Sequence, residues 1–376
     1  MKTKIIICVA AAAMFLGLGA APAREAQYES YSKAFDAGIA FKGAGEFNQA
    51  LQAFNRAEEL TPDADRKMQA CFLAGTALRD LGRWQHLLEA CSSALENGEA
   101  LDYSGPYEPK IKLLYAMALK NTGQKDEAAE CLREIIKDSN DTDAKTDLAL
   151  LLFNGDKKDE AERLLKEVVK EKIEPYQLCL ASHYLGIINQ EKGNYREAIP
   201  YFETVLKNNG STKFMAMTRG ASCCMASDHL PKALAFLGDS AQVKNISQAQ
   251  QNEVDAVVET IFSRLINESD SGRLKNEGLP PSTAEFIKSK LRNKFDSNAR
   301  AISELKKEFP GSRELVPLAK EHDACGQDLE QACSAKNTDI AGMVNAWGKI
   351  EALCTKTMMA KKALYQNQDI LDEGSP

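Results

Sequence analysis

Histidine and cysteine are the residue types in this sequence that could carry nucleophilic or metal chemistry. The four histidines are scattered along the chain: His86, His183, His229 and His322. His322 precedes Cys325 by three residues, which would place the two side chains within one turn of a helix. A zinc site would need two more ligands at short spacing, and Cys333 lies too far along the helix to complete it. The spacing predicts no metal site, and it leaves Cys325 with His322 as the candidate pair for an enzyme.

Other catalytic patterns are missing from the sequence. It contains no Gly-rich phosphate loop, no CxxCH haem attachment and no nucleophile elbow. We therefore predict no cofactor and no catalytic residues, and we look for function in the surfaces that the helices expose.

The N-terminus has the pattern of a secretory signal peptide. The basic start MKTK is followed by an apolar run and by the small-residue site Ala21-Pro22-Ala23. We predict a signal peptide over residues 1–23; the alternative is an N-terminal membrane anchor, for which the apolar run is short. Cleavage would leave 45 basic and 54 acidic residues, a net charge of about −9. This balance argues against a nucleic-acid partner, and the leader favours the bacterial periplasm or cell envelope, with the protein at most peripheral to a membrane.

The stretch over residues 179–209 contains the pattern on which the rest of the chain is built. Leu185-Gly186 lies in one apolar-periodic segment, Gly193 breaks it, and Ala198 and Phe202 lie on the apolar face of a second segment. Such a pattern predicts two short amphipathic helices joined by a tight turn, with a small residue where the helices cross.

The spacing of these residues resembles the tetratricopeptide repeat, a helix–turn–helix unit of about 34 residues. Six copies follow one another over residues 31–240, with small first-helix residues at Gly38, Gly75, Ala116, Ala149, Gly186 and Ala221. The resemblance implies an all-α fold, an α-solenoid of tetratricopeptide-like helical hairpins with a C-terminal helical extension. We predict about six hairpins over residues 24–244 and a helical C-terminal region over residues 245–376.

Two cysteines are expected to face each other across a predicted hairpin. Nine cysteines remain once Cys8 leaves with the signal peptide, and most occupy core positions of the repeats. Cys71 and Cys91 stand at matched distances from the turn at Gly82, so we predict that they face each other and form a candidate disulfide.

The C-terminal region reads as helices that could cap the repeats, because a terminal repeat otherwise exposes an apolar face. A linker over residues 267–282 separates the first helix from the others. The predicted helices are Ile246–Ile266, Thr283–Phe295, Ala299–Phe309, Arg313–Cys333 and Ile340–Tyr365.

The resemblance also implies a binding surface, since the first helices of such repeats line a concave groove for peptide or helical segments. By register, the predicted groove residues are Phe35, Ile39, Lys42, Phe72, Arg79, Leu113, Met117, Lys120, Leu150 and Phe153. The same register makes Thr76, Thr146, His183 and Ile187 accessible. Some members of the family clamp a carboxylate with Lys and Asn at these places, and apolar residues replace that clamp here.

We predict a binding or scaffolding module of the cell envelope that takes a protein or peptide partner on an apolar wall with one positive rail, formed by Lys42, Arg79 and Lys120. Alternatively, the protein's own C-terminal helices cover that wall. Two other functions stay open: a structural assembly subunit of an envelope or secretion machine, and an enzyme with its chemistry beyond Asn245.

Overall fold

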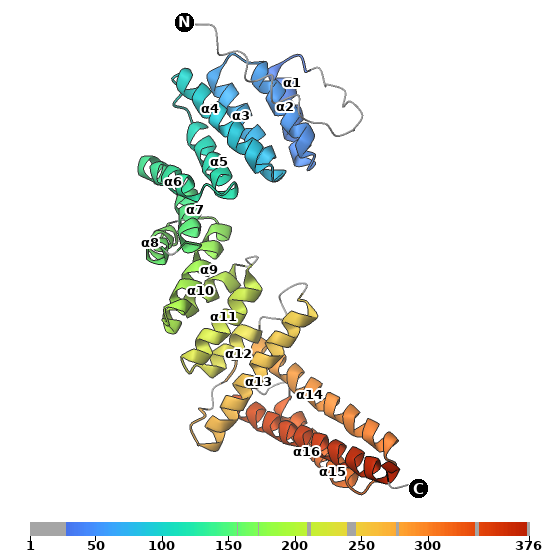
Figure 1. Ribbon diagram of the computed structural model, residues 1–376. Coiled ribbons are helices and arrows are strands. Elements are labelled where there is room, and N and C mark those ends of the chain that lie inside the picture. Colours follow the sequence, from blue (N-terminus) through green and yellow to red (C-terminus); the bar gives the residue numbers. More distant parts are fainter. Residues whose placement is uncertain are drawn as a thin grey trace. The chain divides into compact units, whose positions relative to one another are not determined.

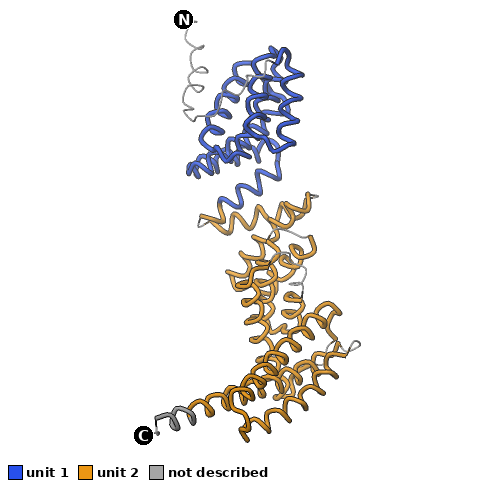
Figure 2. Tube along the Cα trace, turned by 90° about the vertical axis from the view of Figure 1, so that its right-hand side faces the viewer, with its two compact units in different colours: residues 1–151 blue, residues 152–376 orange. Residues whose placement is uncertain are grey.

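The computed structural model describes residues 28–155, 157–171, 173–208, 212–238, 246–275, 278–334 and 338–373, with side chains up to residue 366. These residues contain sixteen α-helices, α1 to α16 (Figure 1). The chain divides into two compact units between Leu151 and Leu152 (Figure 2). The predicted signal peptide lies outside the described residues.

Unit 1 consists of helical hairpins in which the second helices α2 and α4 also pack against the next first helices, α3 and α5. Its helices are α1 (Tyr31–Gly43), α2 (Phe47–Glu59), α3 (Ala64–Asp80), α4 (Trp84–Ala100), α5 (Glu108–Asn121), α6 (Lys125–Ser139) and α7 (Thr142–Phe153), the last of which crosses the division. This stacking of hairpins within the unit is the predicted all-α, tetratricopeptide-like solenoid arrangement.

Two hairpins close at the glycines that the sequence predicted, whereas in the sixth predicted hairpin the close contact is made by Gly220, against Phe236, and not by the predicted Ala221. On α1, a Cβ added to Gly38 would lie 2.5 Å from Cε1 of Phe54, which belongs to α2 and is completely buried. On α9 (Pro175–Glu191), a Cβ at Gly186 would lie 2.7 Å from the ring of Phe202 on α10 (Tyr195–Lys207). Hydrogen therefore occupies the space that a methyl group would need, and the two helices can approach this closely only because glycine is present.

Unit 2 contains the remaining hairpins and the C-terminal helices. Besides α9 and α10, its helices are α8 (Lys158–Val168), α11 (Lys213–Ala226), α12 (Leu230–Gly238), α13 (Gln248–Asp270), α14 (Pro281–Glu308), α15 (Leu315–Ala332) and α16 (Ile340–Glu373). Both α13 and α14 pack on α12, and one apolar core runs from α9 to α16. The C-terminal helices therefore cover the apolar face of the last hairpin, as a cap would.

The structure corrects one predicted break. We expected two helices over Thr283–Phe295 and Ala299–Phe309, but α14 is continuous. The intervening residues include no Gly or Pro, and Asn298 is buried with its Nδ2 donating to Thr357 Oγ1 of α16 at 3.1 Å. A polar residue that the sequence suggested as a helix end is therefore an interior contact.

Two further expectations concern boundaries and membranes. The predicted domain boundary at residue 244/245 falls in a segment that the structure does not describe, inside unit 2, and it stays a prediction. Within the described ranges, none of the helices combines the length and the apolarity that crossing a bilayer requires.

Candidate peptide-binding surface

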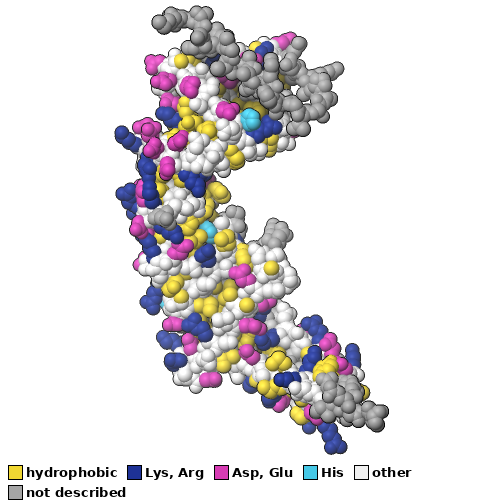
Figure 3. Space-filling view, in the orientation of Figure 1, with side chains coloured by type: hydrophobic (Ala, Val, Ile, Leu, Met, Phe, Trp, Pro, Cys, Tyr) yellow, Lys and Arg dark blue, Asp and Glu magenta, His cyan; other side chains and the backbone are white. Residues whose placement is uncertain are grey.

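The ten predicted groove residues are all at least partly accessible to solvent. Nine belong to unit 1, and Phe153 belongs to unit 2. Ile39 is the most exposed apolar residue among them, with 46% of its surface accessible, whereas Phe35, Phe72 and Leu113 are half-buried. On the face shown in Figure 3, small apolar patches lie between mixed positive and negative side chains.

Aromatic side chains form the floor of this surface in unit 1. The ring of Phe35 stacks on Tyr31 with centroids 5.2 Å apart and meets the edge of Phe54 at 5.9 Å. One repeat further on, the Phe72 and Tyr107 rings lie 6.1 Å apart. These contacts connect the accessible rings to the core, so the row is held in place before any partner binds.

A lysine that the sequence analysis missed lies over these rings. Lys110 Nζ is 5.7 Å from the centroid of Phe72 and 5.2 Å from that of Tyr107, within the range of a cation–π contact. Tyr107 is the residue before α5, and Lys110 lies three residues further on. That spacing, one helical turn, is the signal that could have identified the pair.

The predicted positive rail is paired with carboxylates. Lys42 Nζ lies 4.0 Å from an Asp80 oxygen, and Arg79 Nη2 lies 2.7 Å from the same carboxylate. Lys120 Nζ lies 2.7 Å from Asp147 Oδ1 on the next first helix. The rail therefore presents much less net charge than three unpaired cations would, and the structure differs here from the sequence-based expectation.

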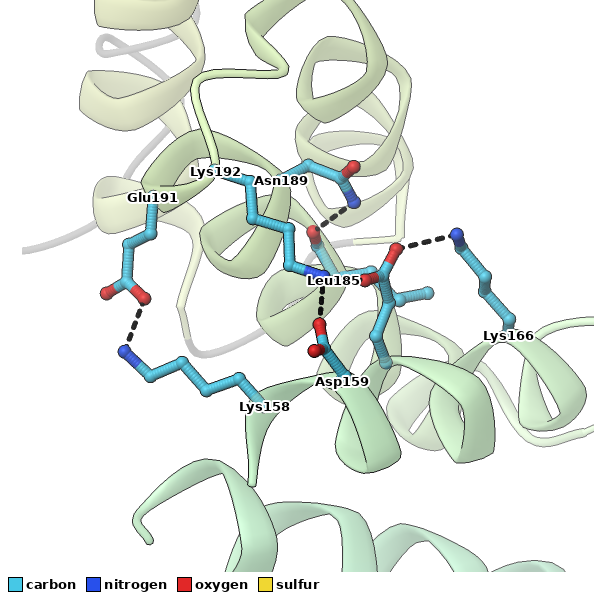
Figure 4. A network of polar contacts seen from close by, with 8 residues as sticks. Lys158, Asp159, Lys166, Leu185, Asn189, Glu191 and Lys192 are labelled. Atoms are coloured by element: carbon cyan, nitrogen blue, oxygen red, sulfur yellow. Dashed lines mark hydrogen bonds and ion pairs between the residues drawn. The ribbon is translucent and has the colours of Figure 1, made fainter. Parts of the chain in front are cut away.

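Unit 2 contains a similar set of polar links between α8 and α9 (Figure 4). Lys158 Nζ lies 2.7 Å from Glu191, and Lys192 Nζ lies 2.5 Å from Asp159. Each of these pairs is substantially exposed, so solvent screens the attraction and each pair contributes little to stability. Their main effect is to set which residues of neighbouring helices face each other.

Four positions that the register made accessible are buried: Thr76, Thr146, His183 and Ile187. His183 is the most informative, because only 3% of it is exposed and its Nδ1 atom has no hydrogen-bond partner among the described residues. Burial, with a smaller effect from Arg219, lowers the pKa of His183 to about 4. The packing of Tyr184 and Phe202 around the ring explains why this position is closed to a partner.

The candidate disulfide residues are free thiols in the structure. Burial raises the pKa of Cys91 to about 12, and burial together with Glu58 raises the pKa of Cys71. Neither thiol is therefore a nucleophile near neutral pH. The disulfide itself stays a prediction.

The candidate catalytic pair lacks the properties of a thiolate site. Burial raises the pKa of Cys325, whereas a cysteine nucleophile needs a lowered one. The ring of His322 stacks on Phe295 with centroids 4.1 Å apart, and its Nε2 atom is buried without a partner in the described part of the chain. Among the described residues, no group of three or more His, Cys, Asp or Glu side chains is placed so that it could hold a metal ion.

Family models of the tetratricopeptide repeat match residues 32–137, 93–185 and 184–212. A tetratricopeptide repeat protein from Parabacteroides merdae is 15% identical over 70% of this chain and 92% of its own, with a TM-score of 0.44. The pilF protein of Pseudomonas aeruginosa is 14% identical over 59% of this chain and 95% of its own, with a TM-score of 0.47. MamA is 20% identical over 46% of this chain and 94% of its own, with a TM-score of 0.38. No curated protein matches the chain at a significant level.

The matched residues coincide with the described hairpins from α1 to α10, including the close glycine–phenylalanine contacts that the repeat requires. Proteins built from such repeats generally mediate interactions between proteins. Residues 32–212 of this chain are therefore similar to tetratricopeptide repeats, both in the family models that they match and in their helical hairpins.

Proposed function

We propose that this protein is a binding or scaffolding module that holds a peptide or helical segment of a partner protein against the first helices of unit 1. The observation that supports the proposal most directly is the row of Phe35, Phe72 and Leu113, which are half-buried at equivalent places on α1, α3 and α5. Apolar side chains that are held by the core yet reach solvent are the kind of anchor that dominates affinity in protein interfaces.

The partner segment that fits this surface is apolar on the side that meets the helices. Ile39 offers an exposed aliphatic contact beside the row, and Lys110 offers a positive charge above the Phe72 and Tyr107 rings. Because Asp80 and Asp147 neutralise the predicted rail, we expect charge to contribute less than the apolar anchors do.

The exported location is part of the proposal and rests on the sequence of the leader. A mature protein isolated from a bacterial cell envelope is expected to begin at or near Arg24. N-terminal sequencing measures this directly, and an intact Met1 in the envelope fraction would refute export by cleavage.

The binding proposal is tested by capture from envelope fractions with the protein lacking residues 1–23. The Ile39→Asp variant places a charge in the proposed groove, and Leu101→Asp is its matched control, because Leu101 is an equally exposed aliphatic residue, at 48%, after the end of α4. We expect the captured protein to be lost with Ile39→Asp and retained with Leu101→Asp. Equal capture by both variants would show that the partner does not use this surface.

A further inference from the structure

The turn between α11 and α12 differs from the turns of four other hairpins. Four hairpins turn at a glycine with positive φ: Gly45, Gly82, Gly123 and Gly193. The equivalent residue in the α11–α12 hairpin is Asp228, with φ 59, and it makes the same backbone contact, its N–H donating to the carbonyl of the residue three before it. A side chain in this conformation costs free energy that glycine avoids, so its presence calls for a compensating contact.

The Asp228 side chain makes that contact with α13. One of its oxygens lies 2.6 Å from Arg264 Nη2, and Arg264 Nη1 donates to the carbonyl oxygen of Met225 at 2.8 Å. The guanidinium of Arg264 is therefore held by two groups of the turn. Arginine fixed in this way presents its remaining donor edge in a defined direction.

Arg264 forms one wall of a cleft with a volume of about 690 Å³. The cleft lies in unit 2 between the α11–α12 turn, the start of α12, the last turns of α13 and the segment that follows it. Gly272, with φ 69, turns that segment back, and the Arg273 N–H donates to the Glu268 carbonyl at 2.8 Å. The lining residues are Asp228, His229, Pro231, Lys232, Arg264, Asn267, Glu268, Arg273, Leu274 and Lys275.

Positive groups outnumber negative groups in this cleft, although the whole chain carries a net charge of −7. Two of the four cations are partly neutralised, because Arg264 pairs with Asp228 and Lys232 Nζ lies 2.8 Å from Glu203. Neither Arg273 nor Lys275 has a carboxylate within ion-pair distance among the described residues. These two side chains are the groups to which an anionic ligand would bind.

Single carboxylates fit the cleft better than a phosphate dianion does. Glu268 also lines the wall, and it would repel the two charges that a phosphate dianion carries on one group more strongly than the single charge of a carboxylate. Pro231 and Leu274 add apolar surface between the charges, and the volume suffices for a few residues of a peptide.

We propose that this cleft is a second binding site, which takes an acidic peptide segment with its carboxylates on Arg273 and Lys275 and an apolar side chain against Pro231 and Leu274. The site is independent of the surface proposed for unit 1, because it uses only residues of unit 2. Asp228 already occupies Arg264, so removing the Asp228 carboxylate would free Arg264 to bind a third carboxylate of the peptide.

The test uses a fluorescein-labelled hexapeptide of alternating glutamate and leucine, with the lysine–leucine peptide of the same length as its negative control. The double variant Arg273→Glu and Lys275→Glu is expected to weaken binding of the acidic peptide about tenfold or more, since it reverses both free cations. The control variant is Lys320→Glu on α15, an exposed lysine outside the cleft, which is expected to change the affinity less than about twofold.

The Asp228→Gly variant is expected to strengthen binding of the acidic peptide, whereas the double variant weakens it. It restores the residue that those four turns use and removes the carboxylate that occupies Arg264, so we expect the acidic peptide to bind about threefold more tightly. If Asp228 served only to hold α13 against the turn, its removal would give no gain in affinity.

Three results would overturn the proposal. In the first, Lys320→Glu weakens binding of the acidic peptide as much as the double variant does. In the second, the peptide does not bind at about millimolar concentration at low salt. In the third, inorganic phosphate displaces the peptide but acetate does not. The last of these would assign the cleft to phosphate groups instead of carboxylates.

Discussion

Replacing Gly38 by alanine would place a methyl group against the ring of Phe54. The added Cβ would lie 2.5 Å from Cε1 and 2.7 Å from Cδ1, and the ring has no room to move because Phe54 is fully buried. Overpacking of this kind costs about 1–3 kcal/mol, whereas alanine gains up to about 1 kcal/mol in helix propensity. We therefore expect Gly38→Ala to lower the free energy of unfolding of unit 1 by about 1–2 kcal/mol.

Two other repeats show how the cost can be removed. Where the first helix carries alanine, the residue sixteen positions later is leucine, as in Ala116 with Leu132 and Ala149 with Leu165. Phe54→Leu alone should destabilise the unit by about 1–2 kcal/mol through lost burial. Combined with Gly38→Ala it should lose less than the sum, with a favourable coupling of about 1–3 kcal/mol.

The measurement is urea unfolding of the full chain in a Trp347→Phe background. The sequence contains two tryptophans, so Trp84 on α4 then reports on unit 1 alone. Gly43→Ala is the matched control on α1, because a Cβ there meets no atom within 4 Å. If Gly38→Ala were no more destabilising than Gly43→Ala, or if the double variant were additive, the close-contact argument would be refuted.

Three further predictions address unfolding and the thiols. The unfolded chain protonates His183 near pH 6.5 and the folded chain only near pH 4, so stability should fall by about 3 kcal/mol as the pH drops between these values. His183→Asn should remove this loss, and His229→Asn, at an exposed position, should keep it when pH-dependent unfolding is compared. Replacing Phe72 by alanine should cost about 2 kcal/mol in urea unfolding, because the ring is half-buried against the core; an unchanged midpoint would argue against that packing. Non-reducing peptide mapping of the oxidised protein should find Cys71 linked to Cys91, and two free thiols would contradict the disulfide.

The helical hairpins could be predicted because their signals are local. A glycine at positive φ in the turn and a small residue at the helix crossing lie within about twenty residues of each other, and both act through steric exclusion. Contacts between distant segments have no such signal. The pairing of Asn298 with Thr357 joins residues 59 positions apart, and the sequence around Asn298 alone favoured the end of a helix.

The groove illustrates the same limit within the repeats. Register on a single helix predicted ten groove residues, all of which are at least partly accessible, although Phe35 and Phe72 also pack against the core. Their role in binding stays a prediction. Register could not predict that His183 is enclosed by Tyr184 and Phe202, because that outcome depends on the sizes of side chains around the ring. Accessibility at a repeat position is therefore decided by its neighbours as much as by its place on the helix.

The net charge that one repeat presents depends on the side chains of the neighbouring repeat. Lys42 and Lys120 seemed to form a positive rail when each helix was considered alone, yet each meets an aspartate of the next first helix. The cations that differ are those without a carboxylate in the described chain, such as Arg273 and Lys275 beside the turn where aspartate replaces glycine. A cation already paired with a carboxylate must lose that contact before it can bind a ligand. Arg273 and Lys275 have no such contact to lose among the described residues, and the Arg273 Nε–H donates only to the Ser271 hydroxyl, at 2.9 Å. The cleft in unit 2 is therefore where added negative charge should bind, and the apolar row in unit 1 is where charge should matter least.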